Sequence, residues 1–144
     1  MAGRIDPFKT FNFRVEIEGV ARADFSEVSG LGLEVAAIEY REGNDKLLTV
    51  RKLPGLVKYN NITLKRGITI DRSLWDWVKQ TVQGNVRRAN MLIVLLDDQG
   101  QDLMRWKVRE AWPCKYEGPT LNAKGNEVAI ESLEVCHEGF ELVE

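Results

Sequence analysis

Apolar and polar residues alternate along most of the chain, and this period of two predicts β-strands that bury one face. The clearest example is FNFRVEIE (11–18), in which every second residue is apolar. DDQG (97–100) has the composition of a short hairpin turn between two such segments. We therefore predict strands at residues 11–18, 21–30, 31–43 and 60–70, on both sides of 97–100, and over 127–144.

One segment departs from this period and has helical spacing instead. A helix of about three turns is predicted, with the apolar positions Leu74, Trp75, Val78 and Val82. Asp71 or Ser73 can cap its first turn, because a short side-chain oxygen accepts from the free N–H groups there. Gly84 is a good stop signal.

Residues 46–59 follow neither pattern clearly. Pro54 has no N–H to donate, and together with Gly55 it argues against a continuous central strand in this segment. The whole pattern predicts a mainly β protein with one helix (α+β), as an antiparallel sandwich or barrel flanked by that helix. Long alternating strands leave unpaired edges, and closing a ring of subunits is one way to remove them.

Composition adds few constraints to this fold. The 144 residues are most simply a single domain, residues 1–144, and the net charge of -2 gives no general reason to expect nucleic acid as a partner. No apolar run approaches the ~20 residues of a membrane span, and MAGRIDPFKTFNF lacks the apolar core of a signal peptide. We expect synthesis in the cytoplasm and no membrane anchor. Residues 127–144 hold six Glu and no Lys or Arg, and this acidic end could dock on the basic middle of the same chain or of a neighbouring copy.

Residues that could carry chemistry are scarce. Cys114 and Cys136 are too few for a disulfide framework, and we expect them to be reduced thiols. His137 is the single histidine, and a strand places it on the face opposite Cys136. No ordinary zinc site can form from this set. We expect no cofactor, no metal and no enzymatic activity, and we interpret Asp97 and Asp98 as turn residues.

A nucleic-acid-binding β-barrel is an alternative from another functional class. Its candidate phosphate contacts are Lys52, Lys65, Arg66, Arg87 and Arg88. Binders of single strands combine such cations with aromatic platforms, and none is interleaved here. The four Trp are better explained by packing on the helix and on the strand after the hairpin turn. We therefore expect no specific nucleic-acid binding.

Four short motifs, in this order and spacing, resemble the tail-tube protein family of contractile phages and of phage-tail-like contractile injection systems. They are SGL (29–31), IEY (38–40), PG (54–55) and NITLKRG (61–67), and the resemblance extends from about residue 11 to the final strand. It implies six-membered rings that stack into a hollow tube, which sheath contraction drives through a target envelope. The implied partners are further copies, a sheath protein, a baseplate or spike, a tube initiator and possible cargo in the lumen.

The resemblance also implies a role for residues 41–60, as an extended loop or hairpin that reaches an adjacent subunit or ring. The implied interface residues are Arg51, Lys52, Leu53, Pro54, Gly55, Leu56, Lys58 and Tyr59. In this interpretation the cations and apolar side chains make contacts, and Pro54-Gly55 forms a bend. A solvated loop on a monomer is the alternative. A tube-initiator paralogue, the type of particle and the strands that line the lumen also stay open.

Overall fold

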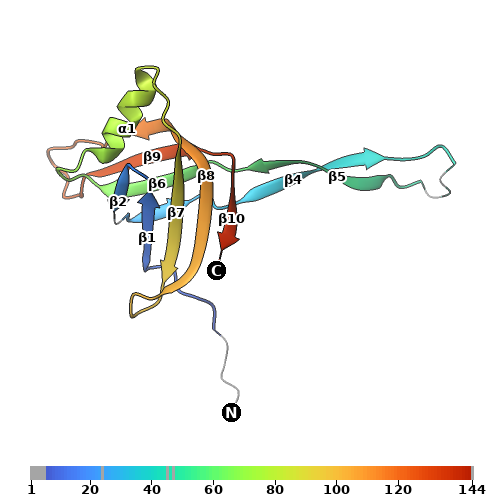
Figure 1. The fold of residues 1–144 in the computed structure, drawn as a ribbon, viewed down its shortest axis with the longest axis horizontal. Helices are drawn as coiled ribbons and strands as arrows, with labels where there is room; N and C mark the ends of the chain where they lie inside the picture. The colour runs from blue at the N-terminus through green and yellow to red at the C-terminus, as the bar shows by residue number, and fades with distance from the viewer. Residues whose placement is uncertain (1–5, 24, 45, 47, 144) are drawn as a thin grey trace, which may run out of the picture.

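The computed structural model describes residues 6–23, 25–44, 46 and 48–143. One helix and ten strands form in this part of the chain (Figure 1). Their bounds are β1 (Phe13–Ile17), β2 (Ala21–Ala23), β3 (Glu27–Ser29), β4 (Leu33–Tyr40), β5 (Arg51–Tyr59), β6 (Ile62–Gly67), α1 (Ser73–Val82), β7 (Ala89–Leu96), β8 (Asp102–Glu117), β9 (Ile130–Cys136) and β10 (Gly139–Val143).

Eight of these strands form one antiparallel sheet around the core. Its order is β2-β1-β7-β8-β9-β6-β3, and β10 also pairs with β8. The long strand β8 joins the two halves, because its first part pairs with β7 and β10 and its last part pairs with β9. Between these parts Glu110 has φ 52°, a backbone conformation that non-glycine residues seldom adopt. The predicted fold, mostly antiparallel β with a single helix, is confirmed.

The alternating residues fill the core as expected. Val15 and Ile17 of β1, Ile62 and Leu64 of β6, and Leu133 of β9 are all almost fully buried. Their polar neighbours in sequence lie on the other face of the sheet, as the period of two requires. Phe11 is an exception to the prediction, since it precedes β1 and is exposed.

The helix forms where it was predicted, but its buried face is different. Leu74, Trp77 and Val78 are buried, and Trp77 Nε1 donates to the carbonyl oxygen of Arg87 at 2.7 Å. Trp75 and Val82 are exposed, so their placement on the apolar face was wrong. The buried stripe of the helix consists of Leu74 and the residues three and four positions after it. Trp75 is only one position from Leu74, so it points to another side of the helix.

The two ends of the helix use the predicted residues in part. Asp71 Oδ1 accepts from the backbone N–H of Ser73 at 2.9 Å, while no side chain caps the helix from the N-cap position, Arg72. This bond from the Ser73 N–H holds the pKa of the Asp71 carboxyl below its usual range, with the Arg66 charge adding to the effect. Gly84 has φ 89° just after the helix, as a glycine stop requires.

Three strand predictions need correction. Residues 21–30 form two short strands instead of one, and residues 127–144 form β9 and β10, separated by His137 and Glu138. Residues 51–59 form the continuous strand β5, where no strand was predicted, but β5 is not a central strand, as Pro54-Gly55 indicated. Pro54 is tolerated because β5 pairs only with β4 in a separate two-stranded sheet, where one side of each strand needs no partner.

Candidate subunit interface

The β4–β5 hairpin projects from the body of the protein as a long arm (Figure 1). The register joins Leu33 to Tyr59 at its root and Tyr40 to Arg51 near its tip. Every residue of β4 is exposed. A two-stranded hairpin with no packed face is at best marginally stable in water. This arm therefore has the properties of a segment that is covered by a partner.

Large apolar side chains are concentrated on the arm. The exposed ones in the two strands are Leu33, Val35, Ile38, Tyr40, Leu53, Leu56 and Val57. Leu56 is the most exposed of them, at 86%. Contiguous exposed apolar surface on a folded protein marks an interaction site far more often than scattered single residues do.

The predicted site residues have different positions on the arm. Lys52 lies opposite Glu39 and Lys58 lies opposite Glu34, so the hairpin supplies an acidic neighbour for each of these cations. Leu53 lies opposite Ile38, and Arg51 opposite Tyr40. Pro54 lies opposite Ala37 within the strand, directly beside a shift in the register. Cross-strand neighbours of this kind stabilise the hairpin itself.

Tyr59 differs from the other predicted residues because it packs on its own subunit. Its ring makes edge contacts with His137, at 5.8 Å between centroids, and with Phe140, at 5.2 Å. His137 Nδ1 accepts from the N–H of Gly139 at 3.0 Å, so Nε2 carries the proton and donates to the carbonyl oxygen of Asn60 at 2.8 Å. These residues attach the root of the arm to β10.

Sequence reasoning missed several residues of this arm. It assigned the extended segment to residues 41–60, whereas the first strand of the arm begins at Leu33. The exposed apolar residues of β4 were assigned to an ordinary strand. A usable signal was present in LEVAAIEY (33–40), where the alternation changes phase at the two alanines. Nothing in the sequence indicated that His137 would contact Asn60.

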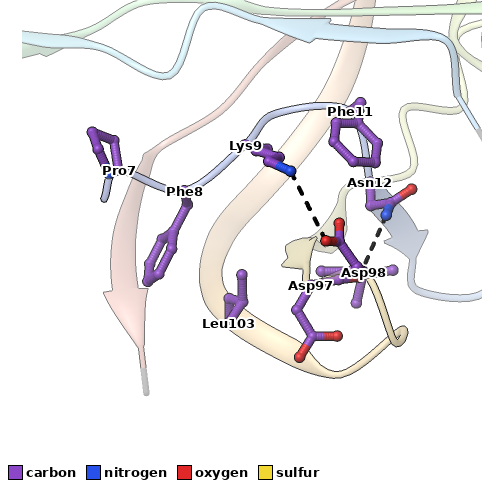
Figure 2. Close-up of a pocket in the computed structure, with 9 residues that line it drawn as sticks. Pro7, Phe8, Lys9, Phe11, Asn12, Asp97, Asp98 and Leu103 are labelled. Carbon is purple, nitrogen blue, oxygen red and sulfur yellow. Dashed lines mark hydrogen bonds and ion pairs between the residues drawn. The ribbon is translucent and has the colours of Figure 1, made fainter. Parts of the chain in front are cut away.

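A shallow groove lies beside the N-terminal segment and the β7–β8 turn (Figure 2). Lys9 Nζ lies 4.0 Å from Asp98 Oδ2, and Asn12 Nδ2 donates to the carbonyl oxygen of Asp97 at 3.4 Å. The Asp97 carboxylate accepts from the N–H groups of Gln99 and Gln101, both at 2.8 Å. These bonds fit turn chemistry for Asp97, as predicted.

The side chains that were considered as metal ligands or nucleophiles make contacts that suit a structural role. In the part of the chain that the structure describes, no three His, Cys, Asp or Glu residues are grouped to hold a metal ion. Cys114 and Cys136 are free, and the Cys114 thiol donates to the carbonyl oxygen of Glu134 at 3.4 Å. Burial, with help from Cys136, raises the pKa of Cys114 to about 12. A thiol with this pKa is a poor nucleophile near neutral pH.

The proposed phosphate contacts are not all free to bind a nucleic acid. Lys65 Nζ lies 3.3 Å from Glu27 Oε2. Arg66 is buried, with its Nε 2.6 Å from Glu131 Oε1 and its Nη1 3.1 Å from Asp71 Oδ2.

No helix among the described residues combines the length and apolar character needed to cross a bilayer. These observations leave the exposed hairpin as the best candidate site.

Known proteins share the whole fold. The profile of the T4-like virus tail tube protein gp19 family matches residues 9–141. A chain from the sheath-tube complex of PVC, an extracellular contractile injection system, is 29% identical with a TM-score of 0.85, over 95% of this chain and 91% of that chain. One from the anti-feeding prophage tube terminating cap is 26% identical with a TM-score of 0.89, over 99% and 95% of the two chains.

More distant structures share the fold alone. Hcp1 from Flavobacterium johnsoniae is 14% identical with a TM-score of 0.56, over 90% of this chain and 93% of that chain. No curated protein sequence matches the chain.

Proposed function

This chain belongs to the family of the T4-like virus tail tube protein gp19, and we propose that it forms six-membered rings that stack into the hollow inner tube of a contractile injection system or phage tail. Its role is structural. The sheath protein surrounds this tube, and a baseplate or spike with a tube initiator lies at its end. The relatives from a sheath-tube complex and a sheath/tube terminator support the sheath protein as a partner.

The observation that carries this proposal is the exposed β4–β5 arm. A free monomer would leave its apolar side chains in water along two strands. Burying apolar surface contributes about 25 cal/mol per Å², so a copy that covers the arm gains directly from these residues. In the proposed interface Leu53 and Leu56 make apolar contacts, while Arg51, Lys52 and Lys58 lie at its polar margin. Pro54 and Gly55 lie between Leu53 and Leu56 and shape the strand there.

Electron microscopy of the purified protein over a range of concentrations tests the proposal, with light scattering to measure mass. We expect hollow stacked rings from the natural sequence. Leu53→Asp places a charge in the apolar contact, so tubes should be lost while the far-UV circular dichroism of the body is unchanged. Leu121→Asp is the control, because Leu121 is also exposed but lies outside the arm. Tubes of normal length from Leu53→Asp would refute the role of the arm.

Two other outcomes concern the function itself. Single rings that never stack would indicate a tube initiator from the same family. Protein that stays monomeric even when the native baseplate is added would overturn the tube proposal.

A further inference from the structure

The β4–β5 arm presents an apolar face at its root. There Leu33 lies opposite Tyr59, and Val35 lies opposite Val57. Directly opposed residues of an antiparallel pair point to the same face, and residues two apart along a strand share that face. These four side chains therefore form one apolar surface, which we call the root face.

Nearer the tip the apolar residues occupy the other face of the same ribbon. Ile38 lies opposite Leu53. Ile38 is three positions beyond Val35, and an odd spacing along a strand reverses the face. Tyr40 shares the face of Ile38, two positions away. Ile38, Tyr40 and Leu53, with Arg51 opposite Tyr40, form what we call the tip face.

A bulge in β5 lets the apolar residues change face at the same place in both strands. From the Val35–Val57 pair to the Ala37–Pro54 pair, β4 advances by two residues and β5 by three. Without the extra residue, Leu53 would lie opposite Glu39 on the charged side of the ribbon. Gly55 lies within the bulge, and a Cβ there would meet Ile38 Cγ1 at 3.0 Å.

The charged residues reverse in the same way. Glu34 and Lys58 are opposed on the face away from the root face, and Glu39 and Lys52 are opposed on the face away from the tip face. In each half of the arm, the Glu–Lys pair lies on the face opposite the apolar pairs. The apolar pairs are on one face of the ribbon in the root half and on the other face in the tip half. The central apolar pairs are similarly exposed, with Val35 at 47% and Val57 at 52%, and Ile38 at 52% and Leu53 at 46%.

We infer that the root face and the tip face bind two different copies of this chain, one in the same ring and one in the adjacent ring. A single partner lying along one side of the arm would bury one apolar pair and face the charged side of the other half. Both pairs leave water only when partners approach from both sides. The pairs are three residues apart along β4, about 10 Å, and the strand twist over that length falls well short of a half-turn.

A second copy is the expected occupant because the proposed function, on which this inference rests, places identical chains around the arm. The root is anchored to β10 through Tyr59 and His137, so a copy on the root face also meets the body of the subunit. The tip stands clear of the body (Figure 1), so a copy there is reached by the arm alone. The two contacts therefore differ in what surrounds them.

Two matched double variants test the inference. The root variant is Val35→Glu with Val57→Lys, and the tip variant is Ile38→Glu with Leu53→Lys. Each replaces an opposed apolar pair by the Glu–Lys pairing that the arm already holds elsewhere, so the hairpin can still form. The control places the same two charges on exposed apolar residues outside the arm, Leu121→Glu with Val128→Lys. Hydrogen exchange of the β4 and β5 amides in each monomer verifies that the strands remain paired.

Light scattering and electron microscopy then identify the largest assembly of each variant. We expect the two variants to stop at different species, one without closed rings and one with single rings that do not stack, while the control forms tubes. Arrest of both variants at the same species, or tubes of normal length from either, would overturn the inference of two partners. Failure of the natural sequence to form rings under any condition would instead overturn the proposed function.

Discussion

At the scale of single residues, Arg66 and Glu131 form the most buried charged contact described in the structure. Their side chains are 6% and 8% exposed, and Tyr116 donates to the second Glu131 oxygen at 2.7 Å. Glu131→Ala leaves the buried Arg66 with Asp71 as its remaining charged partner, and the Asp71 side chain is 48% exposed, so the charge is compensated only in part. The free energy of unfolding should therefore fall by about 3 kcal/mol, the low end of the range for a broken buried pair, in guanidinium titrations.

The matched control for this change removes both charges. Arg66→Met with Glu131→Leu should cost less than Glu131→Ala alone, because no charge is left buried. A double variant whose loss equals the sum of the two single losses would show that the pair is not coupled.

Tyr116 gives a prediction that depends on pH. Burial, followed by its bond to Glu131, raises the pKa of Tyr116 to about 12, above its ordinary value of 10.0. The folded state therefore favours the protonated phenol, and this contribution is complete below pH 10 and is lost as the pH rises toward 12. Tyr116→Phe should lose about 1–2 kcal/mol at pH 7. The difference between the two proteins should shrink from pH 10 to 12, and a constant difference would contradict it.

At the scale of elements, His137 attaches the arm to the body. His137→Ala removes the bond to Asn60, the acceptor for Gly139, and the ring contact with Tyr59. We expect faster hydrogen exchange for amides at the arm root, with a loss of about 1–2 kcal/mol or less in global stability. His137→Gln keeps an amide donor and should restore part of the protection. Unchanged exchange in His137→Ala would show that the arm is held in another way.

The sequence predicted elements whose pattern reflects burial within one subunit. The strands that contribute Val15, Ile62 and Leu133 were predictable because alternation reports one face packed on a core. The arm was predicted only through the family resemblance and with the wrong start, because its apolar residues have no partner inside the chain. The change of phase at residues 36–37 indicates two surfaces, and no single-subunit pattern can say what covers them. The contact between His137 and Asn60 depends on tertiary geometry that spacing does not encode.

At the scale of the whole molecule, the arm lets us compare charge with apolar burial as the source of tube strength. Each of Lys52 and Lys58 has an acidic residue opposite it within the arm. This weakens the idea that residues 51–58 dock on the acidic 127–144 segment of another copy. An exposed ion pair contributes only about 0–1 kcal/mol. The repeated apolar contacts of the arm are therefore the stronger candidate.

Salt distinguishes exposed ion pairs from apolar contacts between copies, because it screens charge. Raising the salt concentration from 0.1 to 1 M shortens the screening length from about 10 Å to about 3 Å. Contacts between exposed charges weaken under this change, whereas burial of apolar side chains does not depend on charge. Assembled tubes should therefore keep their length and mass in 1 M NaCl, as measured by light scattering and electron micrographs. Dissociation into rings or monomers at high salt would show that ion pairs between copies, rather than Leu53, Leu56 and their neighbours, hold the tube together.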